Sequence, residues 1–385
     1  LELSISSGKI KITGLSEPVI CTELTLNSHD DVERLETKSG IHLDSVVAGR
    51  GFHWEKRIPV DLPGKLTIRV VDGHLNIINT LDIEAYVACV ATSEMGSEAP
   101  ADLLAAQTVV ARCWSLALAE AKHISQGFDV CNDDCCQRYQ GTSFLSPHSL
   151  KAAIKTRGQV LVYDNKVIDA RYSKNCGGMV EAYETVWEGE PVPYLIPLWD
   201  GPNPPSGQAV DDFESLWHYE EAYCSSERFK DINLAGMLGN VDVSGSYFRW
   251  EQVMSKKDIL KNLEKYTGKT WQRIDGIRIM DRGPSARIKF LFLDGIDESG
   301  ESAEQLVKSE YGIRRMFSES FLYSSAFVIK NAKTLRSDDH VILRGAGWGH
   351  GVGLCQMGAL GMALNKSDYK AILAHYYPRT TFTQL

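Results

Sequence analysis

The sequence predicts an α+β protein, in which a β-rich N-terminal module precedes a mixed α/β region that opens with a pair of helices. Three changes of period indicate this class. Residues 1–75 alternate apolar and polar side chains, for example from Leu66 to Val70, which is typical of strands. From Ile83 the apolar residues recur at helical spacing. Residues 158–172 return to strand character around a turn, which predicts a hairpin.

The chain is expected to divide into two parts. Its 385 residues are enough for two or three domains. We expect a β-rich module over residues 1–78, which shows no chemistry of its own and packs on the rest or helps to hold a partner. Residues 79–385 are expected to form a catalytic region with a helical pair at its start. An insert over residues 206–335 mixes short helices and strands.

The charge balance narrows the class of partner. With 41 Lys and Arg against 50 Asp and Glu, the formal net charge is −9. No basic stripe is left to neutralise phosphates, so nucleic acid is excluded as a partner. The sequence has no apolar run of roughly 18 residues, so no segment is expected to span a membrane. The chain opens at Leu1 without Met, as a mature form without its signal segment would.

Two consecutive helices are expected between Ile83 and Lys122. The first carries apolar residues at helical spacing and ends at a break over Met95 to Ala99. Pro100 suits the first position of the second helix, where its missing N–H costs no hydrogen bond. The second helix is rich in alanine and apolar on one side, so we expect it to lie in the core.

Glu94 interrupts the apolar face of the first helix. It lies eleven residues after Ile83 and four after Val90, about 20° from the same bearing at about 100° per residue. A carboxyl group on a buried stripe loses hydration, and desolvation favours its protonated form. Such a group can donate a proton to a leaving oxygen, so Glu94 is the candidate general acid.

Spacing alone leaves other interpretations of Glu94 open. A glutamate near a helix end is often solvated or paired with an arginine, and Arg112 on the second helix is a candidate partner. No second carboxylate stands at the spacing expected of a hydrolase, and Glu98 suits capping of the next helix equally well. One acid without a partner fits a reaction in which the substrate supplies its own nucleophile.

Cys131, Cys135 and Cys136 form the one cysteine group at ligand-like spacing, and His123 is the nearest imidazole. Zinc favours four Cys or His ligands, so these residues are a candidate zinc site. A disulfide and free thiols are the alternatives.

The other cysteines are scattered, which does not suit a disulfide framework in a chain of this length. Cys89 and Cys113 lie in helical apolar patterns and are expected to be small buried residues. Cys176 and Cys224 flank the middle of the chain and are candidates to pair.

Seven glycines fall between Gly345 and Gly361. A backbone so free of side chains can adopt positive φ and lie close to another chain or a ligand. Trp348, His350 and Gln356 stand within this run, so it suits a groove that binds a polar, extended molecule by stacking and amide donors. The run matches neither the dinucleotide nor the P-loop pattern, which argues against a phosphate loop. The alternative is a glycine-rich turn with a hydrogen-bonded His350.

Several ordered motifs together resemble the SpoIID/LytB family, the stage II sporulation protein D type. The most specific is Gly347 to Gly353, followed by Gln356 and Gly358. The others are the segment from Leu81 to Met95, Gln107 to Arg112, Asp129 to Gly141, Tyr172 to Gly178, and Ile372 to Pro378. The resemblance covers residues 80–200 and 340–385 well, 270–335 weakly and 1–75 little.

The resemblance implies a peptidoglycan lytic transglycosylase. Glu94 would protonate the glycosidic oxygen between N-acetylmuramic acid and N-acetylglucosamine and then take the proton of the muramoyl C6 hydroxyl. That hydroxyl closes a 1,6-anhydro ring, so neither water, a second carboxylate nor a cofactor is required. The implied substrate-binding residues are Arg112, Ser173, Gly177, Gly178, Trp348, His350 and Gln356.

The resemblance also implies a metal site, which would be structural. Some members bind zinc through two Cys and two His. Cys131 and Cys136 match the Cys positions, whereas Cys135 stands where a His is usual and His123 lies only near the upstream His. The segment from Ser173 to Cys176 also departs from the family's run of serines.

Glycan strands as substrate place the protein outside the cytoplasm, in the periplasm or secreted, with a cell-wall hydrolase as a candidate partner. Two rival functions follow from the same residues. One is a non-catalytic glycan-binding or amidase-activating protein, as part of this family is described. The other is a zinc hydrolase that uses the cysteine group.

Overall fold

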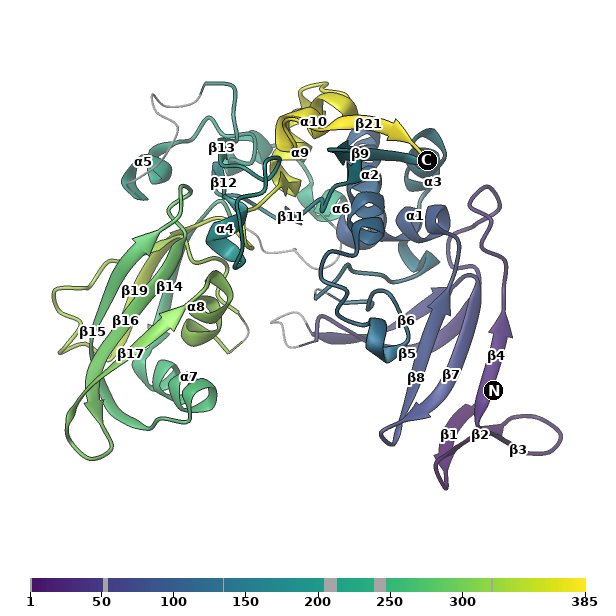
Figure 1. Ribbon diagram of the computed structural model, residues 1–385, viewed down its shortest axis with the longest axis horizontal. Coiled ribbons are helices and arrows are strands. Elements are labelled where there is room, and N and C mark those ends of the chain that lie inside the picture. Colours follow the sequence, from purple (N-terminus) through teal and green to yellow (C-terminus); the bar gives the residue numbers. More distant parts are fainter. Residues whose placement is uncertain (1, 51–54, 134, 204–212, 239–246, 320) are drawn as a thin grey trace.

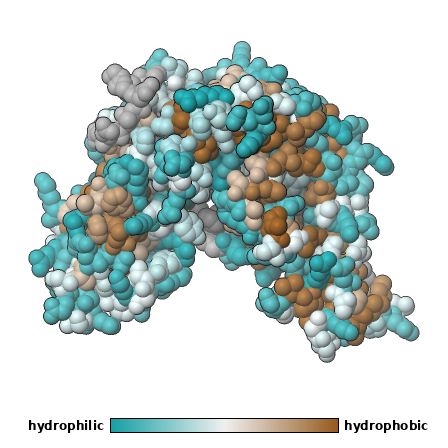
Figure 2. Space-filling model, in the orientation of Figure 1, coloured by the Kyte–Doolittle hydropathy of each residue, from teal (hydrophilic) through white to brown (hydrophobic). Residues whose placement is uncertain are grey.

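A computed structural model describes residues 2–50, 55–133, 135–203, 213–238, 247–319 and 321–385 (Figure 1). It confirms the α+β class, because helices and small, mostly antiparallel sheets share the chain. The space-filling view shows two lobes on either side of a concave notch (Figure 2). Strands β1 to β8 and helices α1 to α3 lie in one lobe, and β14 to β19 with α7 and α8 lie in the other (Figure 1).

The N-terminal strands form three small antiparallel groups. Alternation along β2 buries Ile10 and Ile12 on one face, as a period of two requires. The first group is β1 (Glu2–Ser6), β2 (Lys9–Thr13) and β3 (Val19–Cys21); the second is β4 (Glu23–Asn27), β7 (Lys65–Val71) and β8 (His74–Thr80); the third is β5 (Ile41–Ala48) and β6 (Lys56–Leu62).

Helix α1 (Ile83–Glu94) starts at the N-cap Asp82, whose carboxylate accepts a 2.8 Å hydrogen bond from the Glu84 backbone N–H. It is buried on nearly all sides. The N-terminal strands cover it through residues such as Val60 and Leu66. Helices α2 (Ala101–Ala117) and α3 (Pro147–Lys155) pack against it as well.

Helix α2 is shorter than expected. It ends at Ala117 rather than near Lys122, because Leu118 adopts the left-handed conformation with φ of 42° and the chain turns there. Pro100 occupies the N-cap rather than the first helical position. The expected core location is confirmed, since residues 103–113 are all buried.

The predicted hairpin is present but shorter than expected. Strands β9 (Gln159–Tyr163) and β10 (Lys166–Val167) flank Asp164 and Asn165, whose positive φ angles suit a type I′ turn. Strand β21 (Thr381–Gln384) joins the other edge of β9. Strand β11 (Tyr172–Ser173) leaves the hairpin and pairs in parallel with β20 (Leu354–Cys355).

The second lobe has its own apolar core, which includes Trp250, Leu291 and Phe317. Helices α7 (Lys256–Thr267) and α8 (Glu310–Phe317) lie beside its strands (Figure 1). One sheet is β15 (Trp271–Arg282), β16 (Ile288–Asp297) and β17 (Ser302–Lys308); the other is β14 (Arg249–Ser255), β19 (His340–Ala346) and β18 (Phe327–Ile329).

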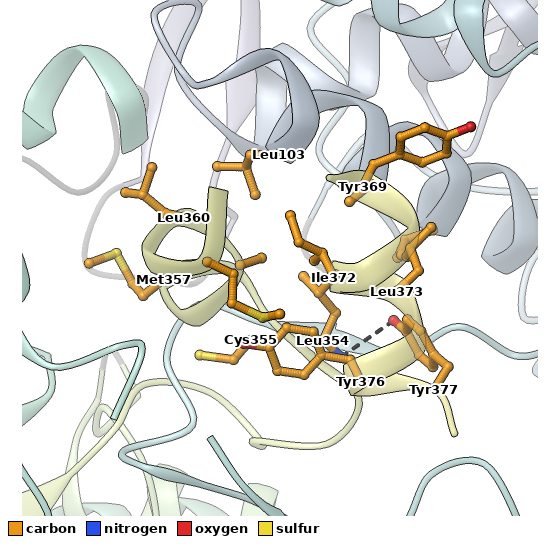
Figure 3. Packing of buried hydrophobic residues seen from close by; sticks show 14 of the residues in the cluster. Leu103, Leu354, Cys355, Met357, Leu360, Tyr369, Ile372, Leu373, Tyr376 and Tyr377 are labelled. Atoms are coloured by element: carbon orange, nitrogen blue, oxygen red, sulfur yellow. Dashed lines mark hydrogen bonds between the residues drawn. The ribbon is translucent and has the colours of Figure 1, made fainter. Parts of the chain in front are cut away.

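The largest core joins α2 to the C-terminal helices α9 (Gln356–Leu364) and α10 (Tyr369–Tyr376). Figure 3 shows Leu354, Cys355 and Tyr376 within it, and the Leu354 N–H donates to the Tyr377 hydroxyl at 3.3 Å. The second half of the glycine run belongs to this core, through residues such as Val352, Leu354 and Leu360.

Short elements connect these parts: the one-turn helices at Ile124–Gln126, Thr142–Phe144 and Ser226–Phe229, the helices α4 (Tyr183–Val186), α5 (Phe213–His218) and α6 (Leu234–Leu238), and the paired strands β12 (Met179–Val180) and β13 (Leu198–Trp199). Within the described residues, no helix combines the length and the apolar character needed to cross a membrane.

Candidate active site

Glu94 is the last residue of α1, and its side chain is buried with 7% of the residue exposed. The burial expected from its place on the apolar stripe is therefore present. Its Oε1 atom accepts two hydrogen bonds, one from the Arg138 backbone N–H at 2.9 Å and one from the Tyr172 hydroxyl at 2.8 Å. Both donors come from segments far from α1 in the sequence.

The Tyr172 hydroxyl keeps its proton over the physiological pH range. Burial and then the neighbouring Glu94 carboxylate raise the pKa of Tyr172 well above its usual range. Tyr172 thus remains a hydrogen-bond donor to Glu94. It reaches the site from β11, whose backbone is held by the parallel pairing with β20.

Lys174 lies two residues beyond Tyr172 and is also buried. Its Nζ atom donates to the Glu94 backbone carbonyl at 3.2 Å. A cation at a helix C-terminus interacts favourably with the helix dipole and satisfies a carbonyl of the last turn. Lys174 therefore stabilises the end of α1 that carries the Glu94 side chain.

The glycine run lies alongside the segment of residues 171–181. Trp348 and Asn175 exchange two backbone hydrogen bonds, of 2.8 and 3.0 Å. The Lys174 carbonyl accepts from the Met357 N–H at 3.0 Å, and the Gly351 carbonyl accepts from the Glu181 N–H at 2.8 Å. The structure thus brings the run beside the residues that contact Glu94.

Close packing against the protein itself explains several of the glycines. Gly351 has φ of +78°, and a Cβ there would stand 2.3 Å from the guanidinium carbon of Arg287. A Cβ on Gly353 would stand 2.0 Å from the Arg171 carbonyl oxygen. At these positions the bare backbone serves packing, not the ligand contact that we expected from the sequence.

Trp348 does not offer a stacking surface, which corrects the sequence-based expectation. The residue is 8% exposed. Its ring centroid lies 3.9 Å from that of Tyr247 and 6.1 Å from that of Tyr323. The indole packs against aromatic rings of the second lobe, so its face is not free for a sugar.

His350 connects the glycine run to Tyr172. Its Nδ1 atom accepts the Val352 N–H at 3.1 Å, and its ring hydrogen-bonds to the Tyr172 backbone. Burial lowers the pKa of His350 to about 3, and the positive charges of Arg171 and Arg287 act in the same direction. His350 is therefore a neutral imidazole that holds the backbone of Tyr172.

Two further expected substrate contacts are structural. Arg112 is fully buried, and its Nε donates to Glu84 Oε1 at 3.0 Å in a two-pronged ion pair. It therefore pairs with Glu84, not with Glu94. Gln356 is 2% exposed, and its amide lies 3.3 Å from the amide oxygen of Gln107. Neither side chain has surface for a substrate.

The remaining expected contacts are Ser173, Gly177 and Gly178. Ser173 is buried, and its hydroxyl has no hydrogen-bond partner among the described residues. Gly177 and Gly178 have φ of +81° and +105° and pack against Gly347 and the Tyr219 ring. The two glycines therefore allow the chain to turn tightly after β11 and to pack against these neighbours.

The structure brings His123, Cys131, Cys135 and Cys136 together, with one ligand atom of each within 4.8 Å of the others. Cys135 Sγ lies 3.0 Å from Cys131 Sγ, 3.6 Å from His123 Nε2 and 4.0 Å from Cys136 Sγ. A tetrahedral zinc ion separates its ligands by about 3.5–3.8 Å. The donor set suits zinc, and the four ligand atoms lie close enough together to reach one ion.

A pocket lies beside this cysteine group. Its lining includes Trp114, Glu120, Cys136 and Arg171. Arg171 donates to Glu120 and to Asp169 there. Glu94 does not line this pocket.

Sequence reasoning missed the residues that contact Glu94: Arg138, Tyr172 and Lys174. One signal was present. Tyr172 and Lys174 flank Ser173 in a polar segment directly after an apolar hairpin, where loop residues often carry function. The contact of Arg138 is made by its backbone, which no residue type reveals.

Two family models and several curated relatives match parts of this chain. A family model described as Stage II sporulation protein matches residues 71–163. Stage II sporulation protein D of Bacillus subtilis is 23% identical over 88% of this chain and 83% of its own length. The chain belongs to the SpoIID/LytB family.

Two other relatives are similar over much of this SpoIID/LytB chain. An uncharacterized protein of Brachyspira hyodysenteriae is 27% identical over 83% of this chain and 71% of its own length. The amidase enhancer of Bacillus subtilis is 27% identical over 76% of this chain, which spans only 39% of that relative.

A second model, described as a domain of unknown function (DUF8618), matches residues 181–353. The SpoIID match therefore holds Glu94 and Arg138, and the second match holds Trp348 and His350. Tyr172 lies between the two matched ranges. In this SpoIID/LytB chain, the segment that joins the matched parts also joins Glu94 to the glycine run.

Proposed function

We propose that this chain is a peptidoglycan lytic transglycosylase that uses Glu94 as its acid and base, outside the cytoplasm. Membership of the SpoIID/LytB family supports a cell-wall-related function. The observation that carries the proposal is the buried Glu94 carboxyl group. Hydrogen bonds from Tyr172 and Arg138 to one of its oxygens hold it in a fixed orientation. A single oriented carboxyl group fits a reaction that needs no second one.

The hydrogen bonds to Glu94 assign its two oxygens different roles. Oε1 already accepts from Tyr172 and Arg138, so a proton on the carboxyl group would lie on Oε2. In the first step Oε2 gives this proton to the glycosidic oxygen, and the bond from muramoyl C1 to that oxygen breaks.

In the second step the same oxygen acts as the base. Oε2 takes the proton of the muramoyl C6 hydroxyl while that hydroxyl oxygen bonds to C1. Glu94 returns to its protonated form, and the products are a 1,6-anhydro end and a free N-acetylglucosamine hydroxyl. The Tyr172 hydroxyl stabilises the carboxylate that exists between the two steps.

The cysteine group supports a structural zinc ion. His123, Cys131, Cys135 and Cys136 would supply four ligands, and a site with four protein ligands leaves no open position for a reacting water. Zinc there would brace the loop that leads to Arg138, whose N–H contacts Glu94. A closed site of this kind does not suit a zinc hydrolase, which needs an open position for water.

The test is digestion of purified glycan strands, followed by mass spectrometry of the products. The wild-type chain is expected to produce anhydro-muramoyl ends, and Glu94→Gln is expected to produce none. Glu98→Gln is the matched control, because Glu98 is an exposed carboxylate just beyond the same helix. Anhydro ends that persist in a folded Glu94→Gln variant would overturn the proposal.

The name of the amidase enhancer favours a second candidate, in which the chain binds glycan and stimulates another enzyme. In that case the wild-type chain binds strands and creates no new ends, and a cell-wall amidase works faster in its presence. Hydrolytic activity that a chelator abolishes but Glu94→Gln retains would instead favour the zinc hydrolase.

A further inference from the structure

A second group of metal-ligating side chains lies in the interior, outside the site described above. It consists of Cys176, Asp200, Cys224 and Cys355, which are each 0% exposed. One ligand atom of each lies within 4.8 Å of the other three. Ordinary buried cysteines such as Cys89 lie among apolar carbons. Here three sulfur atoms converge on a buried carboxylate.

The separations between these atoms match the edges of a tetrahedral zinc site. Cys176 Sγ lies 3.6 Å from Cys224 Sγ and 3.3 Å from Asp200 Oδ2. Bonds of about 2.3 Å to sulfur and about 2.0 Å to oxygen place tetrahedral ligands about 3.8 and about 3.5 Å apart. A disulfide would require sulfur atoms about 2.05 Å apart.

The four side chains come from four separate segments of the chain, each next to a strand or a helix. Cys176 lies in the turn after β11, Asp200 follows β13, Cys224 precedes the one-turn helix at Ser226–Phe229, and Cys355 is the N-cap of α9. Figure 3 shows Cys355 in the packed core beside Tyr376.

Neighbouring groups orient the ligands in the manner of a metal site. Cys355 Sγ accepts the Cys176 N–H at 3.2 Å and the Gly358 N–H at 3.3 Å. The Tyr376 hydroxyl donates to Asp200 Oδ1 at 2.6 Å, while Oδ2 faces Cys176. Such outer contacts fix the direction of the atoms that bind a metal.

The surroundings also compensate the charge of such a site. Three thiolates and one carboxylate around a divalent ion leave a net charge of −2. Arg287 is fully buried and donates to the Cys176 carbonyl at 3.1 Å. Arg249 donates to the Gly177 carbonyl at 2.9 Å. His375 Nε2 lies 3.6 Å from Asp200 Oδ1. The two guanidinium groups reduce the cost of burying the negative charge.

We propose that Cys176, Asp200, Cys224 and Cys355 bind a zinc ion. Three thiolates and one carboxylate are a soft donor set that suits zinc, and four protein ligands with no exposure make the site structural. The ion links the turn at Gly177 to the start of α9, and so joins the two segments that pair as β11 and β20. This inference does not depend on the transglycosylase reaction.

The experiment separates this site from the first cysteine group. A variant with Cys131→Ser, Cys135→Ser and Cys136→Ser removes that group, and its zinc content is measured by elemental analysis after folding is checked by circular dichroism. One equivalent of zinc per chain is expected to remain. Adding Cys224→Ser is expected to remove it. Adding Cys113→Ser instead is the matched control, because Cys113 is equally buried but outside the group.

Cobalt substitution gives a second measurement on the same variant. Thiolate-to-cobalt charge-transfer bands and tetrahedral ligand-field bands are expected, and Cys224→Ser should abolish them. A folded triple variant that holds no zinc, with either three free thiols or a bond between Cys176 and Cys224, would overturn the proposal. Should the triple variant not fold, Cys224→Ser in the otherwise wild-type chain decides: loss of one equivalent of zinc relative to wild type supports the second site, and an unchanged zinc content refutes it.

Discussion

The Tyr172 hydroxyl donates a 2.8 Å hydrogen bond to Glu94 Oε1, while the backbone of the same tyrosine is held by His350. One residue therefore joins the carboxyl group at the end of α1 to the glycine run near the C-terminus. Because β11 pairs with β20, the position of this hydroxyl is set by the backbone of both segments.

We expect Tyr172→Phe to reduce the rate of anhydro-end formation by about 10- to 100-fold, because the carboxylate between the two steps loses a hydrogen bond worth about 1.5–3 kcal/mol. The Michaelis constant should change little, since the tyrosine acts through its hydrogen bond to Glu94. Tyr163→Phe, a half-buried tyrosine packed on Tyr194, is the control. Equal rates for the two variants would contradict this role.

We expect Arg112→Met to lower the free energy of unfolding by about 3–5 kcal/mol, because it leaves Glu84 as an unpaired buried charge. Urea unfolding measures this change. The double variant Glu84→Leu with Arg112→Met removes both charges and should regain most of the loss. A single variant as stable as wild type would show that the ion pair does not hold α1 to α2.

Gly351→Ala should destabilise the protein more than Gly300→Ala. Both glycines have positive φ, of +78° and +89°, so each substitution adds backbone strain of about 1–2 kcal/mol. A Cβ on Gly351 would stand 2.3 Å from the guanidinium carbon of Arg287, whereas the space around Gly300 is open. The overlap adds about 1–3 kcal/mol, which thermal or urea unfolding would detect as a larger loss for Gly351→Ala.

Because His350 is buried as a neutral imidazole, its titration should lower the free energy of unfolding as the pH falls. Its pKa is lowered to about 3 in the folded chain by burial and nearby arginines, against about 6.5 when unfolded. Between these values the unfolded chain binds the extra proton, so this contribution to stability is complete above about pH 6.5 and declines towards pH 3.

The measurement for His350 compares unfolding free energies from pH 7 to pH 4 in wild type and in His350→Asn. The variant should show a shallower decline than wild type, and the exposed His148→Asn should decline as wild type does. Parallel curves for all three proteins would rule out this titration.

Local patterns in the sequence were enough for several features. The apolar residues of α1 place this helix in the core, and Glu94 is buried because neighbours cover the helix on nearly all sides. The short spacing of Cys131, Cys135 and Cys136 limits how far apart their thiols can lie. The positive φ angles at Asp164 and Asn165 suit the turn that their residue types predict.

The tertiary structure decided what these features contact. Tyr172 and Glu94 are 78 residues apart, and Trp348 packs at a tilt against Tyr247 from the second lobe, so no local pattern reports either contact. The glycine run was compatible with a ligand groove or with close packing, and Arg287 decides for packing at Gly351. The sequence by itself determined the helical pair, its buried acid and the cysteine spacing, because these depend on neighbours along the chain. Only the folded chain determined the partners of that acid, because they come from segments that meet in space alone.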